Sequence, residues 1–242
     1  MIGIVIPAHN EERLIGECLD SVLLAAKHPS IQGQTVEILV VLDHCSDNTG
    51  AVVSAKVVAS IDVCFRNVGK ARSVGAEQLL EAGARWLAFT DADTVVPPDW
   101  LARQIEFGAD AVCGTVEVDC WSEYGDAVRS RYLALYQFIE DHRHIHGANL
   151  GLSAEAYRSA GGFQHLIAHE DVQLVADLER IGAHIVWTAT NPVTTSARRD
   201  YKCSGGFGDY LASLITPNTL LGVEPSLSSD AILGSGLTCG SD

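Results

Sequence analysis

Short runs of apolar, largely β-branched residues alternate along the first hundred positions with longer segments whose apolar residues recur at helical spacing. Asn10 precedes the first helical segment as a predicted N-cap, and Pro97 and Pro98 stand where a further helix would begin. The pattern predicts strands over 2–7, 36–42, 61–65 and 85–90, and helices over 11–27, 49–59 and 70–83. This alternation is typical of a parallel sheet flanked by helices.

The rhythm changes after residue 109. The pattern there predicts strands over 110–118, 147–152 and 184–188, and helices over 128–142, 154–160 and from about 169 to 181. From Val223 onward no periodicity remains, which is typical of a mobile tail over 223–242. We therefore predict an α/β fold with a Rossmann-like, doubly wound mixed sheet. A single domain over 1–222 would comprise a nucleotide-binding half, 1–109, and an acceptor half, 110–222.

The charge balance narrows the choice of partners. The 242 residues include 16 Lys and Arg against 31 Asp and Glu, a formal net charge of −15. Nucleic acids and anionic membrane surfaces require a basic footprint, so neither is expected as the main partner. No apolar run approaches the roughly 20 residues that span a bilayer, so no transmembrane segment is expected. We predict a cytoplasmic protein, with peripheral attachment to the inner face of the membrane as a second option.

An acidic motif, Asp91-Ala92-Asp93, follows the fourth predicted strand. Open α/β sheets bind ligands at the carboxyl ends of their strands. One or two carboxylates there, completed by substrate phosphates and water, suit Mg²⁺ or Mn²⁺. The alternative is that both aspartates only shape the turn towards the prolines that follow.

Two further positions are candidates for nucleotide contacts. Asp43 follows the second strand and could accept hydrogen bonds from a nucleoside, or it could form an Asx-type turn. Lys70 lies in the segment 67–72 that joins a strand to a helix, where a helix N-terminus flanked by basic residues can bind an anion.

Charged residues also gather late in the chain. Glu170 and Asp171 begin a predicted helix; one could face the site while the other caps amides, or both could only favour the helix dipole. Arg198 and Arg199 suit a diphosphate, with surface ion pairing as the alternative. The segment His142-x-His144-x-His146 is interpreted as a polar loop near the acceptor rather than as a zinc ligand set.

Taken together, these segments resemble the family-2 glycosyltransferases of the GT-A fold. The resembling pieces occur in the family's order: IVIPAHNEE at 4–12, VVLDHCSDNT at 40–49, NVGKAR at 67–72, TDAD at 90–93, GANL at 147–150, GGF at 161–163 and HEDV at 169–172. Where the family usually has an acidic pair at the end of the second strand, this chain has Leu42-Asp43.

The resemblance implies a metal-dependent, inverting transfer of one sugar from a UDP- or GDP-sugar to an acceptor hydroxyl. The acceptor would be a saccharide, a lipid-linked or a small molecule, in glycan, polysaccharide or glycolipid synthesis. The resemblance would place Pro7, Glu11 and Asp43 around the base, Asp91 near the ribose or metal, Asp93 on the metal, and Asp171 as general base.

Two alternatives stay open. A sugar-phosphate nucleotidyltransferase also uses such a sheet with Mg²⁺, but its glycine-rich loop is replaced here by the residues 7–10. A non-catalytic nucleotide-sugar-binding protein of the same fold is the second alternative. Detection of free nucleoside diphosphate after incubation with donors would separate these possibilities.

Overall fold

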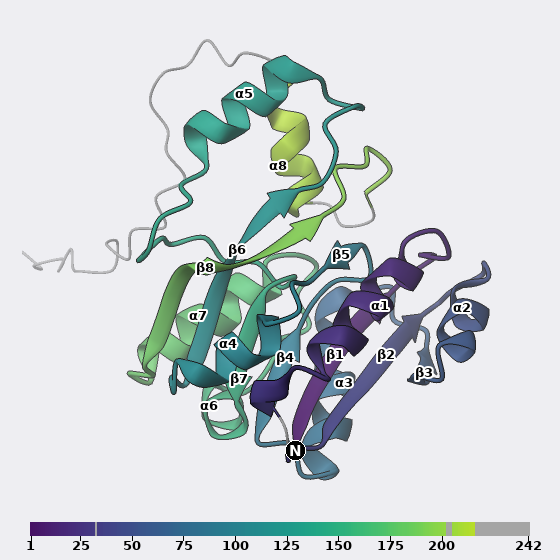
Figure 1. Cartoon of the computed structure of the whole chain (residues 1–242), viewed down its shortest axis with the longest axis vertical. Coiled ribbons are helices and arrows are strands. Elements are labelled where there is room, and N and C mark those ends of the chain that lie inside the picture. Colours follow the sequence, from purple (N-terminus) through teal and green to yellow (C-terminus); the bar gives the residue numbers. More distant parts are fainter. Residues whose placement is uncertain (32, 202–204, 216–242) are drawn as a thin grey trace, which may run out of the picture.

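The computed structural model describes residues 1–31, 33–201 and 205–215 (Figure 1). The predicted tail, 223–242, lies outside the described residues. Within them, one mixed sheet has the strand order β3-β2-β1-β4-β7-β6-β8-β5. Its strands are β1 (Ile2–Ala8), β2 (Val36–Asp43), β3 (Ala59–Val63), β4 (Trp86–Phe89), β5 (Thr94–Val95), β6 (Ala111–Val118), β7 (Leu150–Ser153) and β8 (Ile185–Thr195).

The first four strands of this order are parallel, whereas β7 runs antiparallel to both of its neighbours, β4 and β6. The helices are α1 (Ile15–Ala25), α2 (Thr49–Ala55), α3 (Val68–Glu81), α4 (Trp100–Glu106), α5 (Asp126–Leu135), α6 (Ala154–Ala160), α7 (Glu170–Arg180) and α8 (Phe207–Ser213), with a 3₁₀ turn at Pro29–Ile31. None of the described helices is long and apolar enough to cross a membrane. The predicted doubly wound α/β fold is confirmed.

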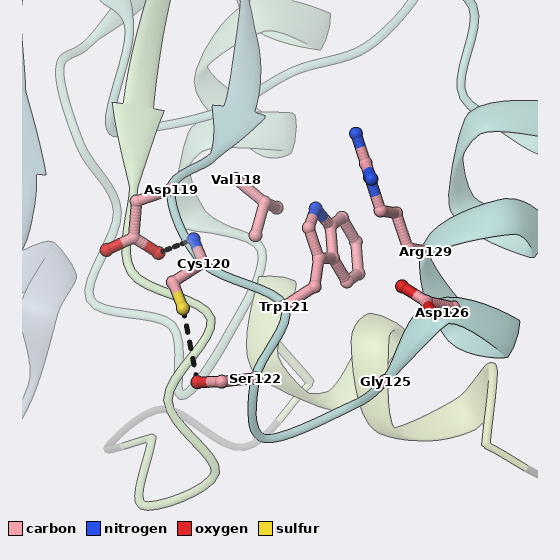
Figure 2. A pocket seen from close by; sticks show the side chains of 8 residues that line it. All are labelled: Val118, Asp119, Cys120, Trp121, Ser122, Gly125, Asp126 and Arg129. Atoms are coloured by element: carbon pink, nitrogen blue, oxygen red, sulfur yellow. Dashed lines mark hydrogen bonds between the residues drawn. The ribbon is translucent and has the colours of Figure 1, made fainter.

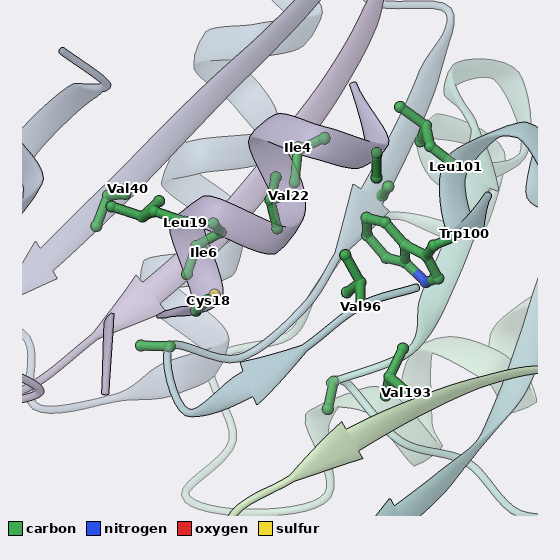
Figure 3. Close-up of a cluster of buried hydrophobic side chains, with 14 of the residues drawn as sticks. Ile4, Ile6, Cys18, Leu19, Val22, Val40, Val96, Trp100, Leu101 and Val193 are labelled. Carbon is green, nitrogen blue, oxygen red and sulfur yellow. The ribbon is translucent and has the colours of Figure 1, made fainter. Parts of the chain in front are cut away.

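Alternation along β1 builds a core on each face of the sheet. Ile4 and Ile6 pack with residues of α1 and with Trp100 of α4 (Figure 3). Val5, between them, faces the opposite side and joins the cluster formed with α3, α6 and α7. Since successive side chains of a strand point to opposite faces, a run buried on both sides must be apolar throughout, as the sequence of β1 is.

A third apolar cluster lies outside these two layers. It joins α5 and α8, which lie beyond the ends of β6 and β8 at the top of Figure 1. Tyr132 is at its centre, 1% exposed, and packs against the rings of Tyr136 and Phe207. Neither α8 nor β5 was predicted; β5 has only two residues, too few to show a period.

The first helix begins later than its pattern predicts. Asn10 is not the N-cap: its backbone has a φ of 55°, and its Oδ1 accepts a hydrogen bond from the backbone N–H of Ser46 at 2.7 Å. The chain then forms a tight turn at Glu11, and α1 starts at Ile15. The side chain of Asn10 therefore links the loop after β1 to the loop after β2, at the edge of the sheet where the parallel strands end.

The largest differences are at the ends of α5 and β8, each seven residues from its predicted position. Helix α5 ends at Leu135 and not at the predicted residue 142, so His142 lies outside it, and the whole histidine segment is in a loop as interpreted from the sequence. Strand β8 continues to Thr195, beyond the predicted end at 188. Its continuation buries polar residues such as Asn191, whose side chain donates to the Trp100 carbonyl. A strand whose buried positions are polar gives no apolar alternation to detect.

Candidate functional site

The candidate site lies where the parallel strands β1, β2 and β4 end at one edge of the sheet. The strand order reverses between β1 and β4, since the chain builds outward to β3 and returns to the other side of β1. Such a reversal is the usual ligand position in open α/β sheets. Asp91 and Asp93 follow β4 directly at this edge.

A buried arginine from α3 holds one side of the site. The guanidinium of Arg72, 4% exposed, contacts Asp91 Oδ1 at 2.5 Å through Nη2 and pairs with Glu170 through Nη1. Burial alone would lower the pKa of Arg72, but the two carboxylates hold it above its usual value. Burial raises the pKa of Glu170, and Arg72 opposes that rise. Arg72 thus joins the acidic motif to the start of α7.

The loop before β7 lies against the same arginine. A Cβ atom at Gly147 would lie 2.4 Å from the guanidinium carbon of Arg72, so any other residue there would displace this guanidinium from its carboxylates. The Gly147 N–H donates to Asp171 Oδ2 at 2.7 Å. Glu170 and Asp171 therefore have different environments: the first is buried on Arg72, and the second is half-buried beside Gly147.

A second arginine closes the other side. Arg198, just beyond β8, contacts both carboxylate oxygens of Glu11 at 2.5 Å and Asp93 Oδ2 at 3.1 Å. Burial and the neighbouring charge of Asp91 raise the pKa of Asp93 to about 7, and Arg198 partly offsets that rise. The buried Nε of Arg198 has no hydrogen-bond partner among the described residues, so this group keeps one donor.

The predicted base contacts lie at this edge as well. Pro7 is buried near the end of β1. The carboxylate of Asp43 accepts three backbone N–H groups, from Phe65, Arg66 and Asn67, at 2.6 to 2.8 Å. In this structure Asp43 therefore holds the distant turn before α3, which differs from the local Asx-type turn considered from the sequence. A contact between Asp43 and a nucleoside stays a prediction.

The two late arginines do not act together. Arg199 is exposed, and its guanidinium lies 5.1 Å from the centre of the Tyr124 ring, away from Asp93. Only Arg198 reaches the acidic motif. Lys70 is half-buried at the start of α3, with its Nζ 6.0 Å from the Phe65 ring, and its predicted nucleotide contact stays a prediction.

The three histidines form a stacked column. The ring of His144 stacks on Tyr136 at 4.0 Å, with His142 and His146 on either side at 5.4 and 6.2 Å. Burial and the two neighbouring histidines lower the pKa of His146 to about 3, and its Nε2 lies 2.8 Å from the Tyr136 hydroxyl. A position of these histidines near the acceptor stays a prediction.

The donor set at the strand edge fits a hard divalent cation. Within the described ranges no three His, Cys, Asp or Glu side chains are grouped as a complete metal shell. Asp91 and Asp93 are an incomplete oxygen shell, the kind that Mg²⁺ or Mn²⁺ completes with substrate phosphates and water. A cation there would also oppose the repulsion that raises the pKa of Asp93.

Sequence reasoning missed the two arginine clusters as units. Arg72 was noted only as part of an anion-binding segment, although its neighbours on α3, among them Ala71, Gly75 and Ala76, are small and buried. An arginine surrounded by small residues on the buried face of a helix is a sequence signal that could have identified Arg72 as a buried cation. Glu11 and Arg198 are 187 positions apart, and no sequence pattern connects them.

Comparisons with known proteins agree with this geometry. A sequence model described as Glycosyl transferase family 2 matches residues 3–163. The chain is 34% identical over 122 residues to the succinoglycan biosynthesis protein ExoO of Rhizobium meliloti (strain 1021), a match covering 49% of this chain. This match spans 32% of the relative's own length.

Solved structures show the same architecture. TarS 1–349 of S. aureus, in complex with UDP-GlcNAc, has a TM-score of 0.63 at 17% identity, covering 88% of this chain and 65% of that one. The mannosyltransferase PcManGT of Pyrobaculum calidifontis, in complex with GDP-Man and Mn²⁺, has a TM-score of 0.62 at 18% identity, covering 82% and 57%. The family match spans Glu11, Asp43, Asp91 and Asp93 of the site, and the fold agrees over most of the chain. The chain therefore belongs to glycosyl transferase family 2 and has the GT-A fold.

Proposed function

We propose that this chain transfers a sugar from a nucleotide diphosphate-sugar to an acceptor hydroxyl with inversion at the anomeric carbon. The observation that carries the proposal is the pairing of Asp91 and Asp93 with two arginines from distant segments, Arg72 and Arg198, at the reversal point of the sheet. Anionic and cationic groups held together at that edge suit a phosphate-metal complex. UDP-GlcNAc and GDP-Man in the similar structures support this donor class.

The reaction makes one bond and breaks one. The acceptor oxygen attacks the anomeric carbon, the bond from that carbon to the phosphate oxygen breaks, and the nucleoside diphosphate leaves with the electron pair. The acceptor proton passes to a carboxylate within hydrogen-bond reach. Inversion requires only this one base and no covalent intermediate.

The different environments of the acidic residues and of Arg198 suggest a different role in this reaction for each. Asp171, half-buried and oriented by the Gly147 N–H, is the base in this proposal. Glu170 is instead committed to Arg72, which orients Asp91. Asp91 and Asp93 would hold Mn²⁺ or Mg²⁺, which as a Lewis acid would offset the charge on the leaving diphosphate. Arg198 would add a cationic donor on the same side.

Donor binding is expected to depend on metal through Asp93. In calorimetry with UDP or GDP and Mn²⁺, EDTA and Asp93→Ala should each weaken binding about tenfold or more, equivalent to about 1.4 kcal/mol. Asp99→Ala is the matched control, because Asp99 pairs with Arg103 at the start of α4. Equal affinity with and without metal would remove the metal from the proposal.

Substitutions of Arg198 and of Arg199 are expected to have different effects on diphosphate binding. Arg198→Gln should weaken the binding of nucleoside diphosphate about tenfold more than that of nucleoside, because its guanidinium lies at the acidic motif. Arg199→Gln should leave both unchanged, since its side chain packs on Tyr124. An equal loss of nucleoside and diphosphate binding in Arg198→Gln would assign Arg198 a structural role only.

Turnover itself is tested with a panel of UDP- and GDP-sugars and Mn²⁺. Release of nucleoside diphosphate from one donor class, and no pyrophosphate, is the expected result. Pyrophosphate exchange would instead favour a sugar-phosphate nucleotidyltransferase. Tight binding of the donor without any release, in the presence of the acceptors that support transfer by related proteins, would favour the non-catalytic alternative.

A further inference from the structure

A pocket of about 500 Å³ lies outside the cluster of metal-motif carboxylates and arginines (Figure 2). It is formed by the loop that leaves β6 and by the first turn of α5. Its volume is in the range of pockets that take small organic ligands. The side chains that define its chemistry are Asp119, Cys120, Trp121, Ser122, Asp126 and Arg129.

The lining combines one aromatic ring with groups of both charges. The indole of Trp121 is held in place by Tyr132, whose ring lies 5.1 Å away at 48°. In Figure 2 the indole lies between the loop and α5, with Asp126 and Arg129 beside it. A flat apolar ring beside hydrogen-bonding side chains matches a pyranose, which has apolar C–H faces and a rim of hydroxyl groups.

The pocket and the metal motif are adjacent to the same strand end. The N–H of Asp119 donates to the Thr195 carbonyl at 3.1 Å, and the N–H of Ser196 donates to the Asp93 carbonyl at 3.2 Å. β6 and β5 are thus the two neighbours of the end of β8. Neighbouring strands are about 4.8 Å apart, so Asp119 and Asp93 are separated by roughly 10 Å of backbone.

Further contacts connect the loop to the segment that carries Arg198. The N–H of Ala197 donates to Asp119 Oδ1 at 3.4 Å, and the N–H of Arg199 donates to Glu123 Oε2 at 3.1 Å. Arg198 lies between these two contacts and reaches Asp93. A molecule in the pocket would therefore lie next to the donor side of the site.

We infer that this pocket binds the acceptor, and that the acceptor is a saccharide whose ring stacks on Trp121. The inference rests on the proposed function and adds the acceptor's chemical class and position to it. The lining contains the carboxylates of Asp119 and Asp126 and the guanidinium of Arg129, so its net charge is negative, like that of the whole chain. A phosphate group would be repelled there, whereas the hydroxyls of a neutral sugar can donate to Asp119 and Asp126 and accept from Arg129.

Cys120 allows the pocket to be tested without turnover. Its thiol is exposed and contacts the Ser122 hydroxyl at 3.1 Å inside the pocket. Alkylation by iodoacetamide would be followed at each cysteine by mass spectrometry, with methyl glucosides, galactosides and mannosides and their disaccharides as probes. At least one sugar class should slow alkylation of Cys120 several-fold. Cys64, exposed beyond β3, is the internal control and should be unaffected.

Variants then assign the protection to the ring. Trp121→Ala should abolish protection and raise the acceptor KM about tenfold or more, with the donor KM unchanged. Trp121→Phe keeps an aromatic ring against Tyr132. It should retain part of the protection of Cys120 and part of the affinity for the acceptor. A partial effect of this kind would show that the loss in Trp121→Ala comes from stacking and not from a folding defect. Arg129→Gln should also raise the acceptor KM, while Arg143→Gln, on the exposed pair with Glu179, should not.

The outcomes separate this inference from the proposed function. No protection of Cys120 by any sugar of the panel, or equal protection of Cys64, would overturn the acceptor pocket. An equal rise of donor and acceptor KM in Trp121→Ala would overturn it too, because the ring would then belong to the donor site. Failure to bind or cleave any nucleotide-sugar would instead refute the proposed function, whatever the alkylation result.

Discussion

Asp171→Asn is expected to slow sugar transfer by about 10²–10⁴-fold, the usual contribution of a general base. The substitution keeps the shape of the side chain, and its amide oxygen can still accept the Gly147 N–H that Asp171 accepts at 2.7 Å. What it removes is basicity towards the acceptor hydroxyl. The affinity for donor should barely change. Initial rates at saturating donor, with a confirmed acceptor, measure the effect.

Two variants on the same helix control this experiment. Glu179→Gln changes an exposed carboxylate that pairs with Arg143 and should leave the rate unchanged. Glu170→Gln should lower stability, because Glu170 is the buried partner of Arg72, and tests whether the two acidic neighbours have exchanged roles. Loss of transfer in Glu170→Gln at full folding, with activity kept in Asp171→Asn, would transfer the base role to Glu170.

Arg72→Met is expected to destabilise the fold by about 3–5 kcal/mol, the cost of removing one partner from a buried ion pair. The guanidinium is 4% exposed and Glu170 5%, so the carboxylate left behind has no access to water as a substitute partner. Asp91 is 35% exposed, so water can solvate it when Arg72 is removed. Its unpaired charge should therefore contribute less to the loss of stability than that of Glu170. The midpoint of urea unfolding should fall with the slope unchanged.

The double variant Arg72→Met with Glu170→Leu tests whether the loss of stability comes from leaving Glu170 unpaired. Replacing both charges with apolar groups removes the unpaired carboxylate, so most of the lost stability should return. Donor binding should remain weakened in the double variant, because Asp91 has lost the group that orients it. An unfolding midpoint equal to that of the unchanged chain in Arg72→Met alone would show that the pair contributes little.

Arg143→Gln and Asp99→Ala are useful controls because Arg143 forms an exposed ion pair with Glu179 and Asp99 a partly exposed one with Arg103. Such pairs contribute about 0–1 kcal/mol, so removing them should change neither stability nor binding by much. The contrast with Arg72 tests burial as the cause, since each variant removes one partner of an acid–base pair, and of the three pairs only that of Arg72 with Glu170 is buried.

Much of the fold was predictable because local sequence and burial agree. The run 2–7 reads as a strand buried on both faces, and the helix over 154–160 was predicted with the bounds that the structure has. The resemblance to family-2 glycosyltransferases was confirmed, since its motifs are local segments at strand ends and helix starts. Asp91 and Asp93 were placed at the edge of the sheet for the same reason.

Other features depend on contacts between distant segments. The sequence favoured a cap role for Asn10, whereas a loop 36 residues away uses its side chain. Arg198 and Arg199 are equivalent in the sequence, yet the path of the chain after β8 directs one to Glu11 and the other to Tyr124.

The residues alone were sufficient for most of the strands and helices, apart from β5 and α8, and for the family and the acidic motif, because each depends on local periodicity or on a short segment. The tertiary structure was needed to show which arginine meets which carboxylate, to separate Glu170 from Asp171, and to form the pocket at Trp121. Charge pairing is a function of distance in space, and distances between remote residues are set only when the sheet and its helices pack together.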